Sequence, residues 1–151
     1  MQVVRSIDQP VILAGCWRYR SAVAALQITT YIVVGLMNEF ELFTMMYFWI
    51  DNYYSDTTDD RINNLIGEMN PFLWEDIGSA DPAYYAEFCH YIKDKTITID
   101  NGFELAKGFI KTIDYVDVTE AFEKPDYDKW LDGCRRYIAG EHKGGEAREI
   151  L

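Results

Sequence analysis

Basic residues are scarce in this chain of 151 amino acids. Lys and Arg total 14 against 25 Asp and Glu, which gives a formal net charge of −11. A nucleic-acid binder needs cations that face phosphates. A protein held on an anionic membrane by charge needs basic residues as well. The composition therefore argues against both classes of protein.

Cysteine and histidine are also few. The three cysteines, Cys16, Cys89 and Cys134, are odd in number and widely spaced, so a disulfide framework is improbable and a reducing compartment is expected. The chain has no CxxC pair and only two histidines, His90 and His142, so no zinc cluster is predicted. His90 falls in an apolar-patterned helix, which favours a core or boundary histidine over a metal ligand. We expect no metal and no cofactor.

Motifs for catalysis are missing too. There is no nucleophile elbow and no phosphate-cradling glycine loop, and Gly144-Gly145 lies in a polar tail. Glu87-Phe-Cys-His90 is a single copy of a pattern that a di-metal helical bundle needs twice. The sequence thus favours a protein that is not an enzyme, with an unrecognised carboxylate site as the weaker alternative.

The apolar content is ample, at 49% with 15% aromatic residues, and it predicts a folded chain of one domain. Apolar residues recur at helical spacing, and no hairpin signal separates strand-like runs. The fold class that we predict is all-α, a compact single-domain bundle of about five helices over residues 37–140. The first helix carries aromatics on opposite sides, so it should be central and buried on more than one side. The predicted helices are 38–54, 59–69, 82–93, 103–113 and 125–140, with a helical turn at 117–123.

Two helix starts have clear capping signals. Asn38-Glu-Phe-Glu41 is a capping box, with Met37 and Leu42 placed as its hydrophobic staple. Asp81-Pro82 combines an N-cap with a proline at the first helical position. The first signal predicts that the folded unit begins near Met37.

Residues 1–36 differ in composition from the rest of the chain. Three arginines precede a largely apolar run of about 15 residues, a pattern that a signal peptide also has. The run is too short and too polar for a confident membrane span. We favour a translation start at Met37, with 1–36 an upstream read-through or a disordered or loosely packed extension. An added helix or strand and a targeting segment are the alternatives. At the other end, residues 141–151 are polar and glycine-rich, and we expect a flexible tail.

Two short features each allow two structural interpretations. Residues 96–100 alternate, which is typical of a short strand or of an extended lead-in to the next helix. Gly67 lies within a predicted helix, where glycine is unfavourable. It indicates either close packing against another helix or a nearby helix end.

The negative charge is concentrated in one part of the chain. Residues 37–94 contain twelve acidic and two basic residues, a net charge of −10, whereas residues 95–151 have −3 and residues 1–36 have +2. Solubility and favourable first-turn acids are one explanation of this imbalance. A surface matched to a basic partner is the alternative explanation.

One stretch carries a resemblance to a known family. Residues 53–69, YYSDTTDDRINNLIGEM, and residues 78–84, GSADPAY, resemble small bacterial immunity proteins, which neutralise polymorphic toxins including those of contact-dependent growth inhibition. The likeness extends over residues 40–115. Arg61 stands where a third acidic residue is common, and residues 1–36 and 116–151 have no counterpart. The matching residues are Tyr53, Tyr54, Thr57, Asp59, Asp60, Ile62, Leu65, Gly67, Glu68, Ala80, Asp81, Pro82 and Ala83.

The resemblance implies a cytoplasmic protein that binds and occludes one cognate toxin domain, itself expected to be basic. Phe72, Leu73 and Trp74 directly precede two acids, and an aromatic anchor beside carboxylates is typical of an interface hot spot. The alternative is that Trp74 fills the core beneath its loop. If the toxin is a nuclease, the carboxylates would take the place of substrate phosphates. A regulatory or adaptor role toward another basic partner is the alternative function. The predicted partner-binding residues are Asp56, Asp59, Asp60, Glu68, Trp74, Glu75 and Asp76.

Overall fold

The computed structural model describes residues 35–74, 77–124 and 126–138. Within these residues the chain is helical and has no sheet, which confirms the all-α fold class. The elements are α2 (Glu39–Tyr53), α3 (Asp60–Met69), α4 (Pro82–Ile92), α5 (Ile99–Ile110), the 3-10 helix η1 (Thr119–Phe122) and α6 (Tyr127–Ile138).

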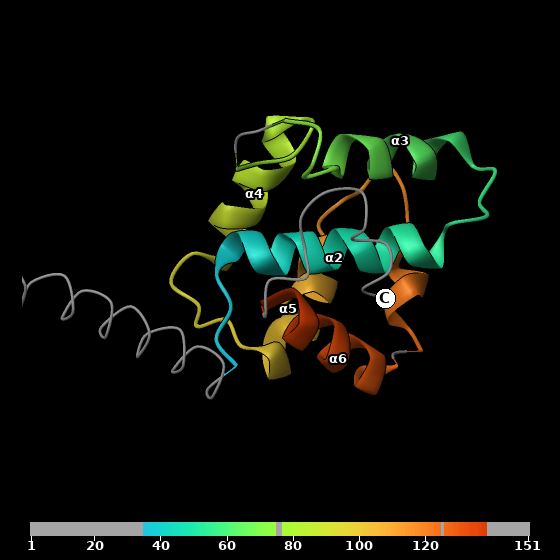
Figure 1. Cartoon of the computed structure of the whole chain (residues 1–151). Helices are drawn as coiled ribbons and strands as arrows, with labels where there is room; N and C mark the ends of the chain where they lie inside the picture. The colour runs from blue at the N-terminus through green and yellow to red at the C-terminus, as the bar shows by residue number, and fades with distance from the viewer. Residues whose placement is uncertain (1–34, 75–76, 125, 139–151) are drawn as a thin grey trace, which may run out of the picture.

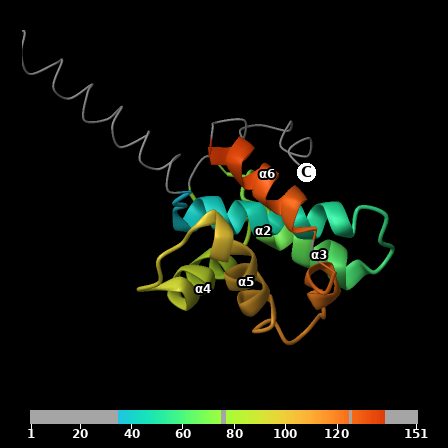
Figure 2. The same ribbon diagram turned by 90° about the horizontal axis from the view of Figure 1, so that it is seen from below.

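Helix α2 lies at the centre of the described fold. Helices α3 and α4 lie on one side of it and α5 and α6 on the other (Figure 1), and the view from below shows α6 crossing α2 (Figure 2). Nine consecutive residues of α2, from Leu42 to Ile50, are buried. A helix that is apolar all round must be covered on all sides, so the prediction of a central, multiply buried helix is confirmed.

Aromatic rings fill the space between α2, α5 and α6. The Phe103 ring lies 5.5 Å from that of Trp49, 5.1 Å from that of Phe122 and 5.2 Å from that of Trp130. The indole Nε1 of Trp49 donates a 2.7 Å hydrogen bond to the carbonyl oxygen of Ala121, which ties α2 to η1. We call Trp49, Phe103, Phe122 and Trp130 the aromatic core. Its edge-to-face ring pairs contribute beyond their burial.

The start of α2 has the cap that its sequence indicates. Asn38 Oδ1 accepts a hydrogen bond from the backbone N–H of Glu41 at 2.8 Å, and Glu41 Oε2 accepts one from the N–H of Asn38 at 2.7 Å. The two staple residues, Met37 and Leu42, are buried and both pack near Gly102.

The segment before α2 pairs with the residues before α5. Leu36 forms an isolated antiparallel bridge with Thr98, and the carbonyl oxygen of Gly35 accepts a 2.8 Å hydrogen bond from the N–H of Ile99. Gly35 has a φ of +61° and lies against the Ile99 side chain, so a glycine is needed there. Residues 96–98 are thus an extended lead-in that makes one bridge. Residues 1–34 and 139–151 lie outside the described residues, and with them most of the predicted extension, the predicted tail and the predicted end of the last helix at residue 140.

The two last helices begin at other positions than predicted. Helix α5 starts at Ile99, ahead of the predicted 103, because Thr98 and Asn101 form a second capping box. It ends at Ile110, since Thr112 and Ile113 donate to carbonyl oxygens three residues back. Helix α6 starts at Tyr127 rather than at residue 125, and the side chain of Asp126 accepts the N–H of Lys129 at 3.0 Å.

Within the residues that the structure describes, no helix combines the length and the apolar character that a membrane span requires.

Candidate functional site

Helix α3 presents a polar side to solvent and an apolar side to the core. Ile62, Leu65 and Met69 are buried, whereas Asp60 and Glu68 are exposed. The two acids are eight positions apart in the helix, about 12 Å along its axis. Two of the predicted partner-binding residues therefore lie on the exposed side of one helix, and Asp56 is exposed in the turn that precedes it.

Asp59 is the N-cap of α3 and has a basic partner of its own. Its Oδ1 accepts the backbone N–H of Arg61 at 2.9 Å, and the Arg61 guanidinium reaches both carboxylate oxygens, at 3.2 and 2.8 Å. The side-chain and backbone hydrogen bonds from Arg61 lower the pKa of the Asp59 carboxyl. Arg61, the residue that departs from the immunity-protein pattern, thus offsets the charge of one predicted partner-binding acid.

Glu68 joins three segments of the chain through two tyrosines. Its Oε2 lies 3.2 Å from the Tyr84 hydroxyl and 3.3 Å from the Tyr115 hydroxyl, and the two hydroxyl oxygens are 2.7 Å apart. Burial, the hydroxyl of Tyr115 and the charge of Glu68 raise the pKa of Tyr84. Both phenols are protonated at neutral pH, and they can donate toward the ionised carboxylate. We call residues 111–118, between α5 and η1, the segment after α5. The network fixes α3, α4 and this segment relative to one another.

A second group of tyrosines and acids lies at the end of α2. The pKa of Tyr53 is raised by partial desolvation and by the nearby charge of Glu120, and that of Tyr54 by burial and by Glu120. Asp117 accepts two hydrogen bonds from Thr119, which lower its pKa. The segment 115–120 thus supplies Tyr115 to the first group and two acids to the second.

The loop between α3 and α4 is held at its base and exposed at its tip. The N–H of Ala80 donates to the Asn70 carbonyl oxygen at 2.9 Å, and the N–H of Asp81 to that of Glu68 at 2.9 Å. Trp74 is 63% exposed, with its Nε1 donating to the Ala80 carbonyl oxygen at 3.2 Å. The alternative that Trp74 fills the core is therefore wrong. Leu73 and Ile77 are exposed beside it, whereas Glu75 and Asp76 lie outside the described residues.

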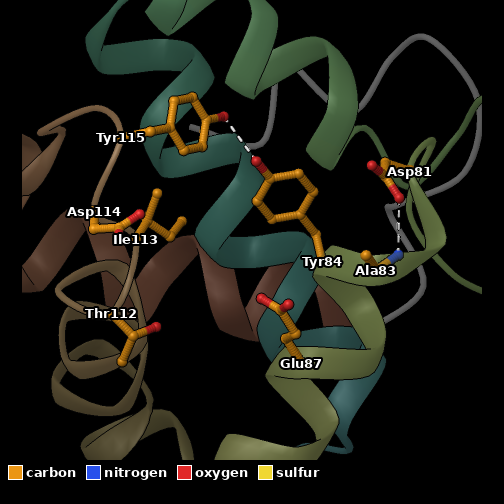
Figure 3. Close-up of a pocket in the computed structure, with 8 residues that line it drawn as sticks. All are labelled: Asp81, Ala83, Tyr84, Glu87, Thr112, Ile113, Asp114 and Tyr115. Carbon is orange, nitrogen blue, oxygen red and sulfur yellow. Dashed lines mark hydrogen bonds between the residues drawn. The ribbon is translucent and has the colours of Figure 1, made fainter.

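A groove opens between the first turns of α4 and the segment after α5 (Figure 3). Its volume is about 280 Å³. The hydroxyls of Tyr84 and Tyr115 meet at one end of it, and Glu87 and Thr112 lie toward the other. The described residues that line it are Asp81, Ala83, Tyr84, Glu87, Thr112, Ile113, Asp114 and Tyr115.

Local structure explains why these side chains face the groove. Asp81 caps α4 by accepting the N–H of Ala83 at 3.0 Å, and Pro82 occupies the first helical position. Tyr84 and Glu87 are three residues apart on α4, so they share one face of the helix. We use the name acid–tyrosine surface for Glu68, Tyr84, Glu87, Asp114 and Tyr115, which the Glu68 network and the groove bring together, and for Asp60, which lies about 12 Å from Glu68 along α3.

Sequence reasoning found only part of this surface. It identified Asp60 and Glu68 by their charge, but it assigned no role to Tyr84 or Glu87, although their spacing was a usable signal. Nothing in the sequence places Tyr115 beside Tyr84, because this contact joins residues 31 positions apart.

The described residues offer little that resembles a catalytic or metal centre. No group of three His, Cys, Asp or Glu among them lies close enough to hold a metal ion. Cys134 is buried, and burial raises the pKa of its thiol to about 12, the opposite of what a nucleophilic cysteine needs.

Comparisons with known proteins yielded no match to a family model, a curated protein or a solved structure.

Proposed function

We propose that this protein is an immunity protein, which binds one cognate bacterial toxin domain and occludes it through the acid–tyrosine surface. The observation that carries the proposal is the gathering of exposed carboxylates and tyrosine hydroxyls over α3, α4 and the segment after α5. Sequence resemblance over residues 40–115 gives it a biological setting.

The electrostatics of this surface favour a basic partner. Between residues 59 and 92 the described exposed acids are Asp60, Glu68, Asp81 and Glu87, and Arg61 is engaged with Asp59. Complementary charge raises the rate of association and excludes partners of the wrong sign. A toxin that acts on an anionic substrate such as a nucleic acid presents cations of this kind around its active site.

An exposed apolar element adjoins the charged surface. Leu73, Trp74 and Ile77 are exposed in the loop between α3 and α4, whose base is held by backbone hydrogen bonds to Glu68 and Asn70. Tryptophan is enriched at interface hot spots, where a rigid apolar ring fills a pocket on the partner. In this mechanism the loop supplies apolar contact area and the carboxylates supply orientation, and the toxin is blocked by coverage without any chemical step.

The proposal implies a protein that acts in the cytoplasm, without a cofactor and without binding nucleic acid or membrane. The test is co-expression with the product of the gene beside this one, which the proposal expects to contain the toxin domain. We expect restored growth, and a purified 1:1 complex with a Kd on the order of nanomolar or below that weakens as salt increases.

An unrelated toxin provides the control, because an immunity protein should rescue growth only from its cognate partner. Failure to form a complex with the neighbouring toxin domain would overturn the proposal. Turnover of a substrate by the isolated protein would favour an enzyme instead.

A further inference from the structure

The groove between α4 and the segment after α5 has the size of a single side chain. At about 280 Å³ it lies at the lower limit of pockets for small molecules and cofactors, which occupy roughly 300–1,000 Å³. A groove this small suits one long side chain entering from a partner.

The lining determines which side chain would fit. Of the eight described lining residues, Asp81, Glu87 and Asp114 are acidic and none is basic. Ile113 and the tyrosine rings add apolar area beside the carboxylates. An occupant must therefore combine an apolar stem with a cationic head, and arginine and lysine have this structure.

Several features favour arginine over lysine. Acceptors are spread over both walls of the groove, with Glu87 on α4 and Asp114 on the opposite segment. A guanidinium offers five N–H donors in a planar fork that can serve separated acceptors at once, and it stacks on aromatic rings such as Tyr84. An ammonium is a compact charge with stronger hydration.

The walls of the groove are fixed before any partner arrives. The Glu68 carboxylate holds the Tyr84 and Tyr115 hydroxyls together, and the Asp81 cap fixes the first turn of α4. Thr112 Oγ1 donates to the Phe109 carbonyl oxygen at 2.6 Å, which secures the opposite wall at the end of α5. Preorganisation of this kind reduces the entropy cost of binding.

We propose that this groove is the socket for one arginine of the protein partner, with Glu87 and Asp114 as its anionic walls and the Tyr84–Tyr115 pair as its closed end. The assignment rests on the proposed function for the identity of the partner. The chemistry of the groove itself can be tested without that partner.

The experiment titrates the ¹⁵N-labelled full chain with N-acetyl-argininamide and follows backbone amide shifts. We expect saturable shifts confined to residues 83–87 and 112–115, with a Kd on the order of millimolar, as is usual for a ligand of this size. The uncharged isostere N-acetyl-citrullinamide should cause no such shifts. Absence of specific shifts at about 10 mM argininamide would overturn the proposal, and equal binding of N-acetyl-lysinamide would overturn the assignment to arginine.

A double variant, Glu87→Gln with Asp114→Asn, removes two charges and keeps the side-chain shapes. It should abolish argininamide binding, whereas the matched variant on α6, Asp128→Asn with Asp132→Asn, should leave binding unchanged. Loss of binding in both would show a dependence on net charge alone and would contradict a socket.

The toxin complex separates this inference from the proposed function. If the complex forms at full affinity with the Glu87/Asp114 variant, the socket is wrong and the immunity function stands. If argininamide binds the groove but no toxin complex forms, the socket stands and the immunity function is wrong.

Discussion

The two sides of helix α2 use aromatic residues in different ways. Toward α5 and α6 the aromatic core consists of phenylalanine and tryptophan, and its central residue, Phe103, is only 1% exposed. Toward α3 and α4 several tyrosine rings are half-buried or exposed, beside the exposed Trp74, and Tyr115 is 47% exposed. Each tyrosine of the Tyr84–Tyr115 pair has its hydroxyl within reach of a carboxylate.

The difference indicates a division between stability and recognition. A fully buried ring contributes its whole transfer free energy, so the α5–α6 side stabilises the fold. A half-buried tyrosine contributes less to stability but offers a rigid ring and a hydroxyl to a partner. Mutations on the two sides should therefore separate folding from binding.

The largest effect is expected in the aromatic core. Phe103→Ala should lower the free energy of unfolding by about 3–5 kcal/mol, because it removes a ring in contact with three other core rings. Urea unfolding measures this loss of stability, and Phe103→Leu serves as a milder variant that should lose less. The matched change Tyr84→Phe should cost no more than about 1 kcal/mol. Equal losses for both would contradict the division.

High pH should destabilise the fold through tyrosines on both sides of α2. Burial raises the pKa of Tyr84, Tyr85 and Tyr137 above the usual value of 10. Below pH 10 these tyrosines are protonated in both states, and their contribution to stability is fully present. Above pH 10 the tyrosines of the unfolded chain ionise first. The free energy of unfolding therefore falls as the pH rises toward the pKa values of the folded state. Urea midpoints between about pH 8 and 11 should show this decline, less steeply in Tyr84→Phe. A flat profile would contradict the burial of these hydroxyls.

Asp81 should contribute both to stability and to recognition of a partner, since it caps α4 and lines the groove. Asp81→Ala should cost about 1 kcal/mol of stability through the lost cap. Asp81→Asn should cost far less, because asparagine caps as well as aspartate does. Both variants should weaken binding of the toxin domain, as measured by calorimetry. Full affinity in Asp81→Asn would leave Asp81 with only the capping role.

Two of the helical glycines, Gly67 and Gly102, should respond differently to replacement by alanine. A Cβ added to Gly67 would have no atom within 4 Å, so Gly67→Ala should raise the free energy of unfolding by about 0.4–1 kcal/mol. A Cβ added to Gly102 would lie 3.1 Å from the Leu42 side chain within the core, and Gly102→Ala should gain less or destabilise. Thermal unfolding of both variants provides the measurement. Stabilisation in both would mean that the core tolerates an added methyl at Gly102.

Trp74 should show the smallest change in stability. Its side chain is mostly exposed, so Trp74→Ala should alter the free energy of unfolding by less than about 0.5 kcal/mol while weakening the toxin complex. The comparison variant is Leu65→Ala, which empties a fully buried position on α3 and should cost about 2–5 kcal/mol. A large stability loss in Trp74→Ala would place that ring in the core.

Local patterns predicted most of the fold. Caps depend on neighbouring residues, and the sequence therefore located the starts of α2 and α4 through Asn38 and Asp81. The predicted start of α5 was wrong. Its capping box is completed by asparagine at position 101, where the usual sequence pattern has glutamate or glutamine. Gly67 was expected either to pack closely or to lie near a helix end, and the second holds, since its carbonyl oxygen accepts the N–H of Asn70.

The site was less predictable because it depends on contacts between distant residues. Charge and the family resemblance selected Asp60 and Glu68, whereas the groove arises where α4 meets a segment some 30 residues later. Likewise the pairing of Leu36 with Thr98 needed a partner that no local pattern identifies. Exposure of Trp74 was one of two interpretations that the sequence allowed, and only the fold distinguishes them.

The most direct test of the account compares two charge reversals of equal size by calorimetry with the toxin domain. One variant, Asp56→Lys with Asp60→Lys, alters the exposed side of α3 and the turn before it; the other, Asp128→Lys with Asp132→Lys, alters α6 by the same charge. Each pair includes one acid in the first turn of a helix, so their effects on folding should be similar. The account predicts that the first variant loses at least about tenfold in affinity and the second stays close to the wild type. Equal losses, or a loss only in the α6 variant, would contradict it.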